Sequence, residues 1–315
     1  MATVTRQRTS TTTATATVVL QPQKSAPVFP DIQTIRNTIP AHCFEPSLWT
    51  SFYYVFRDLS MVTGLVWAAL TFIPTIPNAY LRFAAWMAYG FVQGLVCTGV
   101  WILGHECGHG AFSTHTRLND CVGWALHSFL LPSGLGKYFR VSHFEPTSAV
   151  FRSSEVLYVA ITDIGLALMF TALYYATQAL DLSTVLFLYA VPYFWVHHWL
   201  VAITYLHHNH PDVPHFNEEG WTFVKGALAT VDREFGFIGK HLFHGIIEKH
   251  VVHHLFPRIP FYKADEATEA MKPLLGDLYI RDDRSFLGQL WSVFGTLHYV
   301  ENDPDIKGNM RWVKN

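Results

Sequence analysis

The chain has 315 residues, of which half are hydrophobic and only 15% are charged, and its net charge is −2 with histidine neutral. This charged fraction lies well below the usual quarter of a soluble domain and argues against a soluble protein. No basic excess is available to neutralise phosphates, which argues against a nucleic-acid partner. The four cysteines show no paired spacing, which argues against a disulfide framework. The eighteen histidines are the compositional anomaly.

The first forty residues differ in composition from the rest of the chain. They are rich in Thr and Ser, and their first acidic residue is Asp31. The stretch "ATATVVL" is too short and too polar to be the apolar core of a secretory signal. A transit peptide would share this hydroxyl-rich, acid-poor character and stays open as an alternative. We predict that residues 1–40 form a disordered cytosolic tail and that residues 41–315 form one membrane domain.

Four apolar segments follow the tail, near residues 60–72, 83–103, 156–176 and 185–206. The second is uncharged and long enough to span a bilayer, which takes roughly 20 residues. The first, taken alone, is also compatible with a buried core helix, but four such segments in one chain indicate a membrane protein. The connections "IPTIPNAYLR" and "TQALDLS" are short enough to close helical hairpins. We predict an all-α membrane protein with about four transmembrane helices in two hairpins.

Histidines cluster just beyond the second and fourth segments and again near the C-terminus. "LGHECGHGAF" places two imidazoles four residues apart, on one face of a helix. "EKHVVHHLFP" places three on one side of a helix. If the tail is cytosolic, both hairpins return these groups to the cytosolic side, where they would form a helical, histidine-rich cap. The members of these clusters are His105 and His109, then His207, His208 and His210, then His250, His253 and His254.

The first cluster also matches HExxH, the signature of zinc proteases. A catalytic zinc takes three protein ligands and a water. At least five well-placed histidines are present here, which is too many for one zinc and suits a two-metal centre. A membrane-embedded zinc metalloprotease remains the lower-ranked alternative.

Several longer stretches resemble the membrane-bound fatty acid desaturases, most closely the fungal delta-12 (oleate) desaturases. They are "GHECGHGAFS", "GWALHSFLL", "WLVAITYLHHNHPDVPHF", "KGALATVDREFGFIGKHLFHGIIEKHVVHHLFP" and "FYKADEATEAMKPLLGDLY". The resemblance implies a multi-pass enzyme of the endoplasmic reticulum membrane with a di-iron centre. Such an enzyme would take O₂ and electrons from cytochrome b5 and its reductase, and would act on an acyl-lipid or acyl-CoA substrate. A homo-oligomer is among the assemblies that the resemblance allows.

The resemblance also implies roles for individual residues. Glu106 would orient a metal ligand. Asp232 in "ATVDREFG" would accept a hydrogen bond from a ligand imidazole, although a solvent-facing or helix-capping aspartate is the commoner case. Neutral imidazole nitrogens suit iron. The implied metal ligands are His105, His109, His208, His250, His253 and His254.

One departure from the family pattern bears on activity. The family carries three histidine boxes, and the second, an HxxHH, does not occur between Gly110 and Lys249. An internal deletion with its seam near residues 131–136 accounts for the loss. We expect the remaining histidines to gather one metal, held by the three histidines of "HVVHH" with help from the first cluster, and desaturation to be weak or lost. The alternative is a catalytically silent membrane protein that associates with an intact enzyme.

Overall fold

The computed structural model describes residues 27–130 and 152–314. The predicted deletion seam and the first 26 residues of the predicted tail lie outside the described residues. The remaining part of the predicted tail is not disordered as far as residue 40, because residues 32–38 form a helix. Helix α1 (Ile32–Thr38) begins at Asp31, whose carboxylate accepts hydrogen bonds from the backbone N–H groups of the first turn. This segment is ordered because Ile35 and Ile39 are buried in the same apolar core as helices α9 and α10.

The four predicted apolar segments are all helices, and each is longer than predicted. They are α2 (Leu48–Phe72), α3 (Ala79–His109), α5 (Val156–Ala179) and a continuous rod made of α6 (Leu182–Val185), a π-helical turn η4 (Leu186–Ala190) and α7 (Val191–His208). All four are long and apolar enough to cross a membrane. The prediction of an all-α membrane protein is confirmed, with a few short strands added outside these helices.

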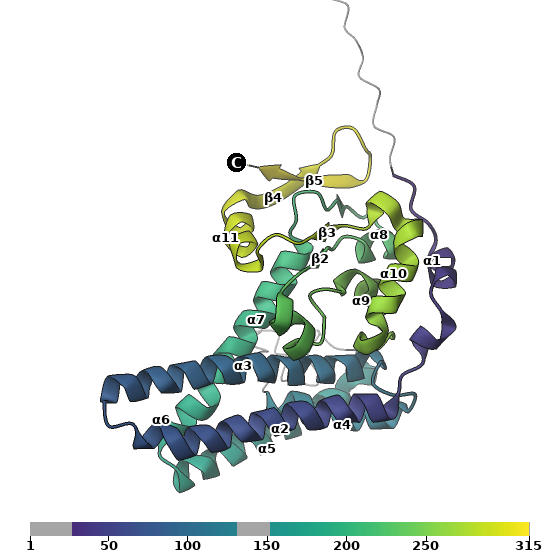
Figure 1. The fold of residues 1–315 in the computed structure, drawn as a ribbon. Helices are drawn as coiled ribbons and strands as arrows, with labels where there is room; N and C mark the ends of the chain where they lie inside the picture. The colour runs from purple at the N-terminus through teal and green to yellow at the C-terminus, as the bar shows by residue number, and fades with distance from the viewer. Residues whose placement is uncertain (1–26, 131–151, 315) are drawn as a thin grey trace, which may run out of the picture.

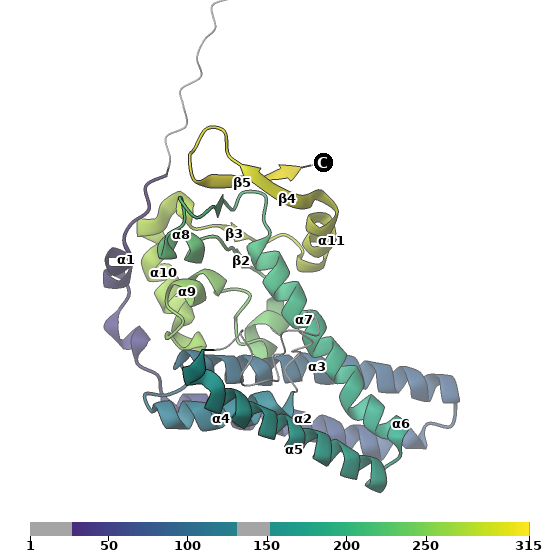
Figure 2. The same cartoon turned by 180° about the vertical axis from the view of Figure 1, so that it is seen from behind.

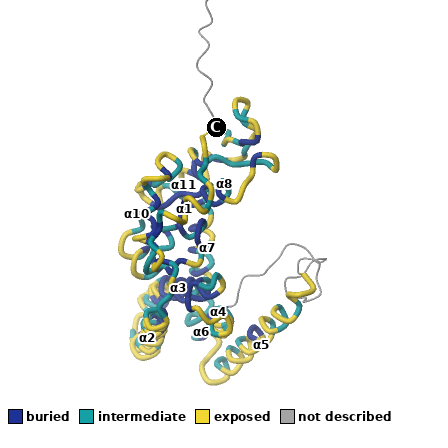
Figure 3. Tube along the Cα trace, turned by 90° about the vertical axis from the view of Figure 1, so that its right-hand side faces the viewer, coloured by how far each residue is buried: buried dark blue, intermediate teal, exposed yellow. Residues whose placement is uncertain are grey.

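Helix α3 is the central helix of the membrane part. It packs against α2, α4 (Thr116–Phe129) and α7 (Figures 1 and 2). Most of α3 is buried, whereas α2 and α5 expose most of their length (Figure 3). Those exposed side chains include large apolar groups such as Ile164, Leu168 and Phe170, which suit contact with lipid.

The chain beyond α7 folds into a cap at the ends of α3 and α7 (Figure 1). The α2–α3 and α5–α6 connections lie at the opposite ends of these helices. A three-stranded antiparallel sheet of order β1-β5-β4 and a two-stranded parallel pair β2-β3 lie within the cap. The cap elements are β1 (His215–Phe216), α8 (Phe223–Ala227), β2 (Asp232–Arg233), η5 (Ile238–Leu242), α9 (His250–Leu255), η6 (Phe261–Lys263), α10 (Ala264–Leu275), η7 (Gly276–Leu278), β3 (Arg281–Asp282), α11 (Phe286–Thr296), β4 (Leu297–Asn302) and β5 (Asn309–Lys314).

A buried hydrogen bond to a carboxylate ties the cap to the membrane helices. Asp58, inside α2, lies 2.7 Å from Nε2 of His244 in the cap, and both side chains are 1% exposed. Arg57 also contacts the Asp58 carboxylate at 2.7 Å and donates to the backbone carbonyl of His241. A carboxylate in an apolar segment is costly unless it is paired, and these partners offset that cost. Gly99 of α3 allows the close approach, because a Cβ there would overlap the carbonyl oxygen of Leu242.

We predict that Gly99→Ala destabilises the fold by about 1–3 kcal/mol, because the overlapping neighbour is backbone and cannot rotate away. Thermal unfolding of the detergent-purified chain measures the effect. Gly64→Ala on α2 is the matched control, since no atom lies within 4 Å of a Cβ at that position. Equal melting temperatures for the two variants would contradict the packing argument.

We predict that the cap and the end of α3 lie on one side of the membrane. A single cysteine at His115 and another at Glu269 should react with an impermeant maleimide from the same side of a sealed vesicle. A cysteine at Thr75, in the α2–α3 connection, should react from the other side. The labelling uses a Cys121→Ser background because Cys121 is exposed while the other three cysteines are buried. Opposite-side labelling of the first two positions would be incompatible with a shared site.

Candidate metal centre

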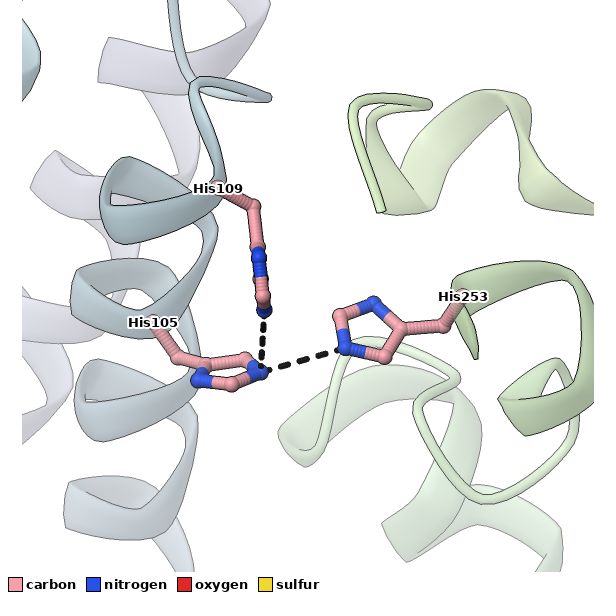
Figure 4. A group of neighbouring side chains, drawn as sticks. All are labelled: His105, His109 and His253. Atoms are coloured by element: carbon pink, nitrogen blue, oxygen red, sulfur yellow. Dashed lines mark hydrogen bonds between the residues drawn. The ribbon is translucent and has the colours of Figure 1, made fainter. Parts of the chain in front are cut away.

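The first group of histidines joins the end of α3 to helix α9. Nε2 of His105 lies 3.1 Å from Nε2 of His109 and 3.1 Å from Nε2 of His253, and the three rings point toward one another (Figure 4). The helical spacing of i and i+4 aligns the two α3 rings, and the helix ends directly afterwards at Gly110, which has a φ of 72°. Trp101 stacks on the ring of His105 with centroids 5.1 Å apart. We call these three histidines the first triad.

The second group joins the end of α7 to the same helix α9. Nε2 of His254 lies 3.1 Å from Nε2 of His250, and the ring of His208 lies 4.7 Å from that of His254. Nδ1 of His250 faces the carbonyl oxygen of Ile246 at 3.2 Å, and Nδ1 of His208 faces that of Ala229 at 3.4 Å. An Nδ1–H donated to a carbonyl fixes the tautomer and leaves the Nε2 lone pair free for a metal. We call His208, His250 and His254 the second triad.

Helix α9 contributes to both triads, so the three histidines of "HVVHH" do not converge on one position, which the predicted arrangement around a single metal required. His253 joins the end of α3, whereas His250 and His254 join the end of α7. The ring of His253 lies 6.0 Å from that of His250 and 5.9 Å from that of His254. The physical reason is that the ends of α3 and α7 approach α9 from different sides. The histidines of each end therefore lie beside only those α9 rings that face the same side. The structure therefore brings all six predicted ligands into two adjacent groups.

Electrostatics within the triads fit a cation. Burial lowers the pKa of His253 to about 2 and that of His254 to about 4, so these rings are neutral at pH 7, the form that binds metals. Neutral rings that carry their proton on Nδ1 direct Nε2 lone pairs at one another across about 3 Å, which is unfavourable unless a cation lies between them. Imidazole donors in this number suit iron or zinc.

A buried arginine holds the end of α7 in position for the second triad. The Arg233 guanidinium donates to the carbonyl oxygen of Leu206 at 3.0 Å and to Asp282 at 3.1 Å. His207 is fully buried and its ring nitrogens face the carbonyls of Ile203 and Ile247. These contacts satisfy polar groups at the helix end, so His207 has a structural role and only the adjacent His208 faces the site.

Asp232 contacts the first turn of helix α9, which agrees with the helix-capping alternative and not with acceptance from a ligand imidazole. Its Oδ1 accepts from the backbone N–H of Val251 at 2.8 Å, and its Oδ2 accepts from the Tyr279 hydroxyl at 2.6 Å. Among the described residues its hydrogen-bond partners include no imidazole. The carboxylate lies at the N-terminal turn of α9, where backbone N–H groups lack helical partners and the helix dipole favours negative charge.

Glu106 lies between the first triad and the loop after α9. Its Oε1 is 3.8 Å from Nδ1 of His253, and its Oε2 accepts from the backbone N–H of Phe261 at 3.2 Å. The side chain is 2% exposed. This position is compatible with the predicted role of orienting a ligand. One carboxylate oxygen is occupied by the protein backbone, so Glu106 is poorly placed to activate a water as a protease base would.

Both triads line one cavity of about 850 Å³, whose other walls are largely apolar residues of α3 and α7. A second, smaller cavity of about 200 Å³ lies among the membrane helices and is lined almost entirely by apolar side chains. Tyr193 lines the smaller cavity, His197 lines the larger one, and their rings are 4.2 Å apart. The site thus opens toward an apolar environment rather than toward a polar surface cleft.

Several of these supporting residues were not found from the sequence. Trp101 stacks on His105, Arg233 holds the end of α7, and Tyr279 donates to Asp232 beside α9. No spacing of residues in the sequence predicts these contacts. His127, which follows the first cluster, packs beside Trp101 with ring centroids 5.6 Å apart and joins neither triad. His143 lies outside the described residues.

Comparison with known proteins agrees with this geometry. The fatty acid desaturase family model matches residues 128–285. An oleate hydroxylase from Claviceps purpurea is 34% identical, with 88% of this chain and 78% of the relative covered. A delta(12) fatty acid desaturase from Mortierella alpina is 35% identical, with 87% and 89% covered. A delta(12) acyl-lipid conjugase from Impatiens balsamina is 34% identical, with 90% and 91% covered.

The alignment lengths also bear on the predicted internal deletion. The match to the Mortierella alpina desaturase runs over 357 positions, which is more than the 315 residues of this chain. The relative therefore has residues inside the aligned region that this chain lacks, as an internal deletion requires. Identity at this level along almost nine tenths of the sequence shows that the chain belongs to the fatty acid desaturase family, a family of membrane oxidoreductases that modify fatty acyl chains.

Proposed function

We propose that this chain is an O₂-dependent desaturase of oleoyl chains at the delta-12 position, with one iron in each histidine triad. The observation that carries the proposal is the pair of adjacent triads built on α9, because two neighbouring sites with three imidazoles each match a two-metal centre. When bound, the irons would supply the activation of O₂ that removes two hydrogens from the acyl chain. The electrons would come from cytochrome b5 and its reductase.

The protein's own residues would place the acyl chain and keep water away. The larger cavity brings apolar side chains of α7, such as Leu200 and Val201, beside the triads. The smaller apolar cavity could take a further part of an acyl chain, because its lining offers little to a polar ligand. Trp101 covers one face of the His105 ring. An apolar surround of this kind limits solvent access and influences the potential of a bound metal.

The four candidate spans and the large apolar surface of α2 and α5 suit a multi-pass enzyme embedded in lipid. We propose the endoplasmic reticulum membrane as its location and an acyl-lipid or acyl-CoA as its substrate. A homo-oligomer within that membrane forms part of the same proposal. One of the relatives carries a name that refers to the endoplasmic reticulum, an omega-6 fatty acid desaturase of Brassica juncea.

The missing box weakens the proposed centre without removing it. Each triad supplies three imidazoles, and every ligand removed from a metal site lowers its occupancy. We therefore expect less than full iron loading and slower desaturation than in an intact relative. The second candidate function is a catalytically silent protein that associates with an intact desaturase, and it is favoured by the residues that this chain lacks relative to its aligned homologues.

A zinc metalloprotease is disfavoured on two grounds. The histidines of the HExxH stretch share their site with His253, and a second triad lies beside it, whereas a catalytic zinc needs one such group. Glu106 bonds to the backbone N–H of Phe261. Proteolytic activity that is lost in Glu106→Gln and retained in His254→Ala would support the zinc metalloprotease instead.

We predict that the triads lose iron separately. His253→Ala should remove iron from the first triad and His254→Ala from the second, so each variant should hold about half the iron of the parent. Iron per purified chain, measured by elemental analysis, gives the result. His298→Ala is the matched control, because His298 lies in β4 and belongs to neither triad. Iron that is unchanged in both triad variants would exclude the triads as the iron sites.

We predict that expression in a yeast strain without delta-12 desaturase activity yields little linoleate, and less than the Mortierella alpina desaturase does. Restoring an HxxHH-containing segment of that relative at the 131–136 seam should raise the yield. Hydroxylated or conjugated fatty acids would show that the chain carries out the reaction named for the hydroxylase or the conjugase relative instead of desaturation. Full iron loading without any product, even after the segment is restored, would favour the silent, associating protein.

A further inference from the structure

A third group of potential ligands lies on the outside of the cap, away from the two triads. His42 and Cys43 belong to the 3₁₀ turn η1 (Ala41–Phe44), and Glu266 belongs to the first turn of α10. Nε2 of His42 lies 2.9 Å from Oε2 of Glu266 and 3.9 Å from Sγ of Cys43. One nitrogen, one sulfur and one carboxylate oxygen thus lie within 4.8 Å of one another.

These distances bracket the edges of a tetrahedral zinc site. With Zn–N and Zn–O bonds of about 2.0–2.1 Å and a Zn–S bond of about 2.3 Å, neighbouring ligand atoms are separated by roughly 3.3–3.6 Å. The observed His–Glu separation is somewhat shorter and the His–Cys separation somewhat longer. Small side-chain rotations of the two exposed residues, His42 and Glu266, would equalise them, because Cys43 is held from inside.

The burial of the three residues suits an ion at the edge of the protein. Cys43 is fully buried and belongs to the core that contains Val252 of α9 and Met271 of α10. The side chains of His42 and Glu266 are 56% and 53% exposed. An ion bound here would be held from the interior by a thiolate and reached from solvent past the other two ligands, with water at the fourth position.

Contacts beside the group fix the two backbones that carry the ligands. Lys263 Nζ donates to the carbonyl oxygens of His42 and Glu45, each at 2.5 Å. The Tyr262 hydroxyl accepts from the backbone N–H of Ser47 at 2.7 Å. The ligands are therefore brought together by the fold itself, which reduces the ordering that metal binding would require.

A bare surface ion pair between His42 and Glu266 is the competing explanation. Exposed pairs of this kind contribute about 0–1 kcal/mol, and such a pair needs no thiol. The third donor distinguishes the group from a surface ion pair, because thiolate sulfur, imidazole nitrogen and carboxylate oxygen are the three donor types that bind zinc in proteins.

We propose that His42, Cys43 and Glu266 bind Zn²⁺ and that this ion pins the segment before α2 to helix α10. The site is independent of the iron centre and of the proposed desaturation. Its structural effect would reach helix α9, because Cys43 packs in the same core as Val251 and Val252.

The test uses the full chain purified in detergent, with zinc and iron measured per chain and Co²⁺ added as a spectroscopic probe. We expect about one zinc per chain and a thiolate-to-cobalt charge-transfer absorption. His42→Ala and Glu266→Gln should weaken zinc binding at least about tenfold and leave iron unchanged. Both residues are exposed, so these variants should fold. Cys43→Ser should abolish the charge-transfer absorption.

Matched controls are His298→Ala, Glu269→Gln and Cys121→Ser, which replace the same residue types at exposed positions outside the group. They should keep both zinc and the cobalt absorption. A parent chain without zinc and without the absorption would overturn the proposal. So would site variants that bind zinc as tightly as the controls, because the metal would then be held elsewhere.

Discussion

The convergence of neutral imidazoles from three distant helices is the constraint on which the rest of this structure depends. Six rings meet where α3 and α7 end and α9 begins. Neutral imidazoles whose Nε2 atoms lie 3.1 Å apart share a hydrogen bond when one ring carries its proton on Nε2. When the rings carry their protons on Nδ1, the facing lone pairs repel one another unless a cation lies between them, and the surrounding fold must then hold the rings in place. The stiff ends of two long helices and the short helix α9 provide that rigidity.

The end of α7 and the start of α9 are each held by a hydrogen bond to a buried charged side chain. Arg233 donates to the carbonyl oxygen of Leu206 at the end of α7, and Asp232 accepts from the backbone N–H of Val251 at the start of α9. The Asp58–His244 contact connects the cap to α2. Buried charges such as Asp58, Asp232 and Arg233 are stable only when they are paired or hydrogen-bonded, so the loss of one partner would cost several kcal/mol.

The chain lacks the second HxxHH box of the family pattern, and we expect it to offer fewer metal ligands for that reason. The six triad histidines lie on α3, α7 and α9, and none of these helices includes the predicted seam. The region lacking the second box follows α4, which packs between α3 and α5. All four candidate spans are present in the described residues, so the proposed deletion would change the number of ligands available to a metal rather than the helices that position the triads.

The sequence by itself determined the membrane class and the four spans, and its spacing singled out His105, His109, His250, His253 and His254, whereas His208 was chosen among His207, His208 and His210 only through the family resemblance. Apolar length and the i, i+4 spacing are local properties, and a helix realises them wherever it lies. It did not predict that His253 would separate from His250 and His254, because that division depends on which helix end approaches each side of α9.

Tertiary structure also decided the role of Asp232 and the order of residues 32–38. Asp232 bonds to the backbone of α9 and to Tyr279, and Ile35 is ordered by burial against elements more than two hundred residues later in the chain. Such contacts join residues with no local pattern in common. Their energies arise from desolvation and packing, which exist only once the chain has folded.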